Sequence, residues 1–203
     1  TLKTLTVSTW FKTSTASGHK IIGLENSQTG TGSTVYDRDI YIGTDGKVYF
    51  HINDGSNKYA ISSFTYTDGT WHHAVGVSSG DSGSISLYID GALQQTTSIG
   101  TIATTYTSSY WRLGSYKSSG LTNASDGYFT GTIDEARVYN RALSDDEVSR
   151  LYQTTAPAGI DTGLVGYWPF DGKDISGTTP YDRSGKGNNG TVTNGPTASV
   201  GKV

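Results

Sequence analysis

The chain has 203 residues, a formal net charge of −3 and 27 glycines, and only 16% of its residues are charged. This balance, without a basic patch, argues against nucleic acid as a partner, and no apolar run of about 18 residues is present that could insert into a membrane. Because there is no cysteine, disulfides, cysteine-ligated zinc and thiol catalysis are excluded. A cysteine-free chain rich in Ser, Thr, Gly and Tyr suits an extracellular or cell-surface module.

The first 140 residues are predicted to form strands joined by turns. Apolar and polar residues alternate over residues 5–11, 48–53 and 85–90, which is the period of a strand with one buried face. Such runs recur roughly every 8–12 residues, as in a two-sheet sandwich. Four Asp-Gly pairs lie between them and favour type I′ hairpin turns: Asp45-Gly46, Asp54-Gly55, Asp68-Gly69 and Asp90-Gly91.

A short surface helix is predicted over residues 144–153. Ser144 with Glu147 three residues later forms a capping-box pattern, and two aspartates between them favour the positive end of the helix dipole. Residues 154–162 then read as a linker. After the linker, residues 163–170 are an apolar, aromatic strand candidate.

Catalytic carboxylate pairs are not evident. A retaining glycosidase needs two carboxylates about 5–5.5 Å apart, whereas Asp134 and Glu135 are adjacent in the sequence and are expected to face opposite sides of a strand. The same argument separates His72 from His73 and disfavours zinc. The sequence shows no nucleophile elbow or phosphate loop, so we expect no enzyme activity.

Other acidic residues allow a calcium interpretation that a simpler one outweighs. The triplet Asp37-Arg38-Asp39, together with Asp54 and Asp68, supplies the oxygen ligands that calcium prefers. Turns or solvated ion pairs explain these residues more simply.

Two segments carry a resemblance to a known family. They are GTIDEARVYNRALS at 131–144 and GLVGYWPFD at 163–171, the latter followed by YDRSGKGNNGT at 181–191. With WHH at 71–73 and LYIDG at 87–91, they resemble the laminin-G-like domains of the concanavalin A-like lectin/glucanase superfamily. The resemblance implies an all-β, concanavalin A-like jelly-roll sandwich of two antiparallel sheets with one short surface helix. The Glu-x-Asp-x-Glu signature of the glucanases with this fold is missing.

The order of these motifs departs from the family, where the segment resembling 163–171 opens the domain. Here it comes last, and three explanations are open. The segment is the start of a truncated repeat, it closes its own sandwich, or it is donated as a strand to a neighbouring chain. We favour closure within the chain. The predicted division is a jelly-roll core over 1–153, a linker over 154–162 and an opening-strand segment over 163–203, with self-association through that segment as the alternative.

The resemblance also implies a calcium site in which Asp134 and Asp182 supply carboxylates and Asn188 an oxygen. The alternative is that Asp182 only caps its own turn. For a glycan ligand, aromatic rings and hydrogen-bonding side chains are required. The predicted ligand-binding residues are Tyr116, Tyr128, Asn123 and Asp126.

These features predict a non-catalytic, extracellular module that binds glycan or a cell-surface or matrix ligand and is stabilised by Ca²⁺. The alternative is a structural subunit of an extracellular filament or surface layer, assembled by strand donation.

Overall fold

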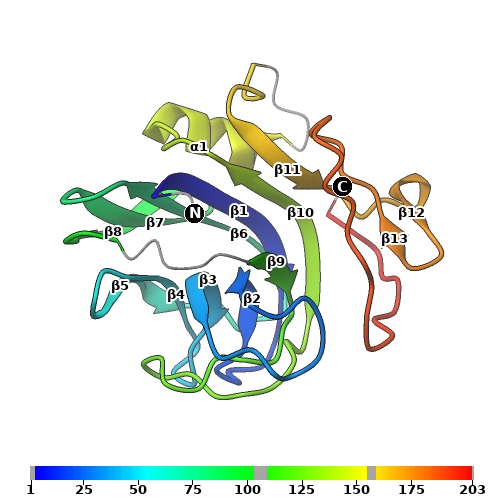
Figure 1. The fold of residues 1–203 in the computed structure, drawn as a ribbon, viewed down its shortest axis with the longest axis horizontal. Helices are drawn as coiled ribbons and strands as arrows, with labels where there is room; N and C mark the ends of the chain where they lie inside the picture. The colour runs from blue at the N-terminus through cyan, green and yellow to red at the C-terminus, as the bar shows by residue number, and fades with distance from the viewer. Residues whose placement is uncertain (1–2, 103–108, 155–158, 203) are drawn as a thin grey trace.

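The computed structural model describes residues 3–102, 109–154 and 159–202, which form two antiparallel sheets packed face to face (Figure 1). The six-stranded sheet has the order β11-β10-β1-β6-β7-β8, and the five-stranded sheet has the order β5-β4-β3-β2-β9. A small hairpin, β12–β13, lies outside them. The six-stranded sheet contains β1 (Thr4–Lys12), β6 (Trp71–Ser79), β7 (Ser84–Ile89), β8 (Ala92–Ser98), β10 (Thr132–Tyr139) and β11 (Leu164–Trp168). The five-stranded sheet contains β2 (Lys20–Glu25), β3 (Tyr36–Ile42), β4 (Lys47–Asn53), β5 (Asn57–Thr65) and β9 (Tyr110–Leu113), and the hairpin is β12 (Ile175–Ser176) with β13 (Thr179–Pro180).

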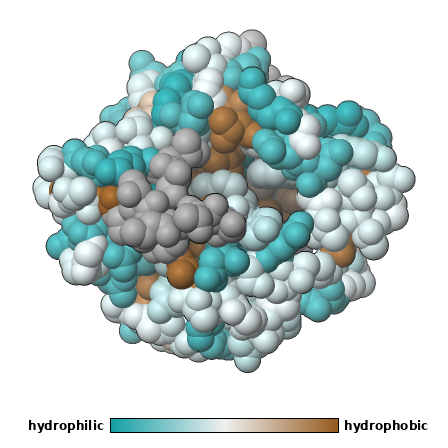
Figure 2. All heavy atoms as spheres, viewed as in Figure 1, coloured by the Kyte–Doolittle hydropathy of each residue, from teal (hydrophilic) through white to brown (hydrophobic). Residues whose placement is uncertain are grey.

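The core fills the space between the two sheets. Phe11, Phe50 and Leu87 are fully buried in it, and a Cβ on Gly76 would lie 2.4 Å from the Phe50 ring. The glycine therefore lets β6 approach that ring. Outside the core, the face shown in Figure 2 is mostly hydrophilic or neutral in hydropathy, with hydrophobic residues gathered in a few patches. The all-β sandwich with one short helix is confirmed.

The helix α1 (Asp145–Gln153) begins at the predicted capping box. The Ser144 side chain accepts from the Glu147 N–H, and the Glu147 side chain accepts from the Ser144 N–H. Val148 and Leu151 are buried in a second apolar cluster on the outer side of the six-stranded sheet (Figure 1). In the part of the chain that the structure describes, no helix is both long and apolar enough to cross a membrane.

The Asp-Gly turns differ from the prediction at three of four positions. A type I′ turn needs positive φ at both residues, and only Asp90-Gly91 has it, with φ of 52° and 77°. At the other three pairs only the glycine has positive φ. The reason is local: each of these aspartates accepts the backbone N–H two residues further on, which is an Asx turn. The bonds are Lys47 N to Asp45 Oδ1, Ser56 N to Asp54 Oδ1 and Thr70 N to Asp68 Oδ1.

The strand β11 pairs antiparallel with β10, so the six-stranded sheet includes the segment that follows the linker. Trp168 lies opposite Ala136, joins the main core and donates from Nε1 to the Asn188 carbonyl at 3.0 Å. The loop over 181–190 is held to the same strand, because Tyr167 donates to Asp182 and accepts from Arg183. In Figure 1, β11 runs beside β10. The division into 1–153, 154–162 and 163–203 stays a prediction.

The edge strands of the two sheets, β5 and β8, meet through side chains. Gln95 Oε1 accepts from Ile61 N at 2.7 Å, and Gln94 Oε1 accepts from Ser63 N at 3.2 Å. In the opposite direction, Thr97 Oγ1 donates to the Tyr59 carbonyl at 2.8 Å. Glutamine side chains of one sheet thus satisfy backbone N–H groups on the edge of the other.

A pH-dependent contribution to stability is expected from His72. Its Nδ1 lies 2.8 Å from Asp90 and its Nε2 lies 3.1 Å from Asp68; the hydrogen bond to Asp90, followed by that to Asp68, raises the pKa of His72. A raised folded-state pKa stabilises the fold fully below the unfolded value of about 6.5 and loses that effect as pH rises through the folded value. Urea unfolding of wild type and His72→Gln should therefore give a larger difference at about pH 5.5 than at about pH 9. A difference that is constant over this interval would contradict the assignment.

Candidate functional site

The outer face of the five-stranded sheet carries three tyrosines on neighbouring strands. The Tyr41 and Tyr49 rings stack with centroids 4.9 Å apart, and Tyr59 meets Tyr49 edge-on at 6.1 Å. Residues 115–128, which we term the covering loop, lie over these rings and place Leu121 against them. The tyrosine face is therefore covered by the chain itself.

Hydrogen bonds from all three tyrosines hold the covering loop in place. Tyr41 donates to the Thr122 carbonyl at 2.7 Å, Tyr59 accepts from Thr122 N at 3.1 Å, and Tyr49 accepts from Asn123 Nδ2 at 2.8 Å. Burial raises the pKa of Tyr41, so its hydroxyl stays a donor. Asn123 is predicted to bind ligand, but in the structure its side-chain amide donates to Tyr49 and so helps to hold the covering loop.

The other three predicted ligand residues lie on the same loop. Asp126 accepts from Lys117 and from the N–H groups of Ser118 and Ser119. Burial alone would raise the pKa of Asp126, but these hydrogen bonds lower it well below its usual range. Tyr116 and Tyr128 pack edge-on at 5.4 Å, and Tyr128 is 41% exposed. The structure thus brings all four together on one loop, and their role in binding a glycan stays a prediction.

Beside the tyrosines lies a group of ion pairs that we term the buried charge cluster: Lys20, Glu25, Asp37, Arg38, Asp39 and Arg112. Lys20 Nζ lies 3.0 Å from Glu25 and 2.9 Å from Asp39, and Arg112 lies 2.6 Å from Glu25. Arg38 pairs with Asp37. Their side chains are 0–8% exposed. Three cations and three carboxylates therefore balance one another out of contact with water.

The interpretation of Asp37-Arg38-Asp39 as a turn or a solvated ion pair is wrong. All three residues lie inside β3 and are fully buried. Arg38 has a φ of 55°, and the β2–β3 register shifts nearby, which marks a bulge. A Cβ on Gly23 of β2 would lie 1.9 Å from Asp39 Oδ1, so glycine at that position makes room for the carboxylate.

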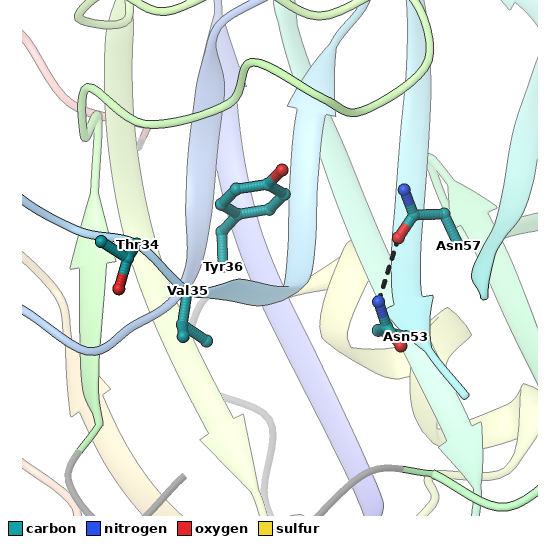
Figure 3. A pocket seen from close by; sticks show the side chains of 5 residues that line it. All are labelled: Thr34, Val35, Tyr36, Asn53 and Asn57. Carbon is teal, nitrogen blue, oxygen red and sulfur yellow. Dashed lines mark hydrogen bonds between the residues drawn. The ribbon is translucent and has the colours of Figure 1, made fainter. Parts of the chain in front are cut away.

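An open surface depression of about 300 Å³ lies at the strand ends next to this cluster (Figure 3). We term it the Tyr36 pocket, and its lining is Thr34, Val35, Tyr36, Asn53 and Asn57. Tyr36 begins β3, Asn53 ends β4 and Asn57 begins β5. The walls are therefore formed by the turn between β4 and β5 and by the start of β3. The covering loop borders it, because Asn57 Nδ2 donates to the Gly120 carbonyl at 3.4 Å.

Hydrogen bonds to the charge cluster orient the two amides of the pocket. His51 bridges Asp39 at 3.3 Å and Asn57 Oδ1 at 3.0 Å. Asn53 Nδ2 donates to Asn57 Oδ1 at 3.2 Å, as Figure 3 shows, and the backbone N–H of Asn53 donates to Asp37. A phenol ring and two oriented amides can contact a ring of C–H groups and its hydroxyls.

Sequence reasoning missed the Tyr36 pocket. The stretch Asn53-Asp-Gly-Ser-Asn57 has the composition of a turn, and Tyr36 stands at a strand start with no motif around it. Only the pairing of β3, β4 and β5 brings these residues together.

The three predicted calcium ligands are occupied by hydrogen bonds within the chain. Both Asp182 oxygens accept donors of Tyr167, Ser184 and Asn188. Asn188 donates from Nδ2 to the Val165 carbonyl, and its own carbonyl accepts from Trp168. The hydrogen bonds of Asp182 within its own turn are those that the turn-capping alternative expects. The calcium site stays a prediction of the resemblance.

Asp134 and Glu135 do not alternate across the strand as expected. The β1–β10 register shifts beside them, and Glu135 has a φ of 53°. This bulge lets Glu135 reach Arg137 and Tyr167, while Asp134 accepts the backbone N–H of Lys202 at 2.6 Å. Burial raises the pKa of both carboxyl groups. Among the residues placed by the structure, no group of three or more His, Asp or Glu side chains is arranged to hold a metal ion.

Comparisons with known proteins agree with the architecture. The family model Laminin_G_3, described as the concanavalin A-like lectin/glucanases superfamily, matches residues 1–149. No curated protein sequence matches the chain.

Similar folds occur among solved structures. One is a protein of Bacteroides ovatus described as a candidate for carbohydrate binding (TM-score 0.65, 18% identity), and the match covers 96% of this chain and 52% of that one. A second is the CBM40 of a Ruminococcus gnavus sialidase bound to α2,3-sialyllactose (TM-score 0.56, 18% identity, 74% of this chain and 83% of that one). A third is domain 4 of AbnA, a GH43 extracellular arabinanase of Geobacillus stearothermophilus, with arabinotriose (TM-score 0.54, 22% identity, 74% and 67%). This chain spans about half of the Bacteroides protein, and at these identities the likeness describes the fold.

Proposed function

Because the chain belongs to the concanavalin A-like lectin/glucanases superfamily, we propose that it is a non-catalytic glycan-binding module and that the glycan enters the Tyr36 pocket. The observation that carries this proposal is the lining of the pocket, which combines one aromatic ring with two asparagine amides already oriented by hydrogen bonds. Aromatic rings combined with a few placed polar groups are a common feature of small-ligand sites. A volume of about 300 Å³ suits a ligand as small as a sugar unit.

The chemistry of the pocket supports binding without catalysis. Its lining contains no carboxylate, whereas glycoside hydrolysis uses a pair of them. The carboxylates beneath the pocket, Asp37 and Asp39, are buried in ion pairs with Arg38 and Lys20. They are therefore committed to the sheet and cannot reach a scissile bond.

The fold neighbours support the same class of function. By their descriptions, one is a sialidase module with a bound sialyl sugar, and another is a domain of an extracellular arabinanase with a bound arabinose trimer. We extend this to an extracellular or cell-surface location for the present module. The proposal needs no calcium. The filament alternative has less support, since β11 pairs with β10 of its own chain.

Substitution of Tyr36 tests the proposal. Stacking on an aromatic ring contributes roughly 0.5–1.5 kcal/mol, so Tyr36→Ala should weaken binding of a glycan identified on an immobilised glycan panel by about 2- to 12-fold. Tyr110→Ala is the matched control, because it removes another partly exposed ring, 39% exposed on β9. Titration calorimetry on folded protein gives the affinities.

Tyr128→Ala separates this pocket from the covering loop. If Tyr128→Ala abolishes binding while Tyr36→Ala leaves it intact, the ligand lies on the covering loop and the pocket assignment is wrong. If no glycan on the panel binds the wild-type protein, the function itself is wrong.

A further inference from the structure

We propose that the Tyr36 pocket selects uncharged sugars and rejects sugars that carry a carboxylate, such as sialic or uronic acids. This inference rests on the proposed function and concerns the same site. It follows from the distribution of charge around the pocket, where Lys20, Lys58 and Lys117 are each already paired with a carboxylate of the chain.

The cations beneath the pocket are already paired with carboxylates. Lys20, Arg38 and Arg112 are 0%, 0% and 8% exposed at their side chains, and each contacts a carboxylate of the buried charge cluster. Three positive and three negative side chains leave no excess charge there. His51, the bridge to the pocket, already lies between Asp39 and Asn57.

Asp54, in the hairpin between Asn53 and Asn57, lies 4.0 Å from Lys58. Burial alone would raise the pKa of Asp54, but hydrogen bonds from Gly100 and Ser56 lower it, so the carboxylate is ionised near neutral pH. The charges of this hairpin are therefore one anion and the cation paired with it, and Lys117, which interacts with Tyr36 from the covering loop, is likewise paired with Asp126 at 2.9 Å.

A carboxylate that enters a pocket loses hydration, and this costs several kcal/mol unless a cation compensates. Proteins that recognise carboxylates supply Arg or Lys for this purpose. The Tyr36 pocket supplies neutral amides instead: each amide keeps one N–H that can donate to a sugar hydroxyl, and Asn53 Oδ1, which accepts from Gly55, can accept one more hydrogen bond.

Matched glycans test the selectivity. Calorimetry would compare two neutral oligosaccharides, arabinotriose and lactose, with two acidic ones, α2,3-sialyllactose and an oligogalacturonide. We expect each neutral ligand that binds to have an affinity at least about 10-fold higher than that of its acidic counterpart, the equivalent of 1.4 kcal/mol. Their affinity should not change between low and high salt, since no ion pair forms.

Two substitutions at the rim sharpen the test. Lys58→Gln removes the cation paired with Asp54, next to Asn57 in the sequence, and should leave neutral-glycan binding unchanged. Asn57→Lys places a cation in the pocket and should weaken the preference for neutral glycans over acidic ones.

Binding of an acidic glycan that is lost in both Tyr36→Ala and Lys58→Gln would overturn the charge inference and keep the proposed function. Absence of any Tyr36-dependent binding would overturn the proposed function, and the inference with it.

Discussion

Lys20→Met is expected to lower the free energy of unfolding by about 3–5 kcal/mol. Lys20 is fully buried between Glu25 and Asp39, so its removal leaves three carboxylates against two cations out of contact with water. A buried charge without a partner is far more costly than the pair is stabilising. Because small domains are stable by only about 5–15 kcal/mol, urea unfolding should show a large fall in the midpoint.

The matched control is Lys58→Met, since the Lys58 side chain is 37% exposed and lies 4.0 Å from Asp54. An exposed pair of this kind contributes about 0–1 kcal/mol. Equal losses in the two variants would mean that the cluster is hydrated in solution.

A double variant separates charge imbalance from lost packing. Lys20→Met with Asp39→Leu removes one cation and one carboxylate, and the remaining charges are two of each, paired as Arg38 with Asp37 and Arg112 with Glu25. We expect the double variant to be more stable than the sum of the single losses by about 0.5–3 kcal/mol, the range for directly coupled residues. Simple additivity would show that the balance of charges is irrelevant.

Trp168→Ala should also cost about 3–5 kcal/mol. Trp168 is 8% exposed, packs in the main core and donates to the Asn188 carbonyl, although it lies beyond the residues that the family model matches. The substitution therefore tests whether residues 163–203 close this sandwich. Chemical unfolding gives the loss directly.

The control for Trp168 is Val200→Ala on the same segment, which removes part of an 82% exposed side chain and should change stability by less than about 0.5 kcal/mol. A small loss in Trp168→Ala would mean that the segment is not part of the core in solution.

The wild-type melting temperature should also be independent of protein concentration. A rise with concentration would indicate that β11 is supplied by a neighbouring chain.

Local patterns explain which parts of the fold were predictable. The helix follows from Ser144 and Glu147, whose capping contacts lie within one turn of chain. The sheets follow from the alternation along β1, β4 and β7, because one face of each strand packs in the core. These signals are contained in neighbouring residues.

The buried charges and the pocket could not be predicted in the same way. A charged triplet in a sequence indicates exposure unless its partners are known, and Lys20 and Arg112 reach Asp39 and Glu25 from separate strands. The bulges at Arg38 and Glu135 carry no sequence signal either, since both residues occupy a φ region unusual for their type. Long-range pairing, rather than local preference, decides these features.

The glutamine contacts between β5 and β8 also affect how copies of this protein meet one another. An edge strand with free N–H groups can template a strand from another molecule, which is how cross-β aggregates grow. Here Gln94 and Gln95 already occupy the N–H groups of Ile61 and Ser63. Two side-chain amides thus block that edge to incoming strands. Edge-to-edge aggregation is disfavoured at Ile61 and Ser63 without a proline or a charge at those positions of β5.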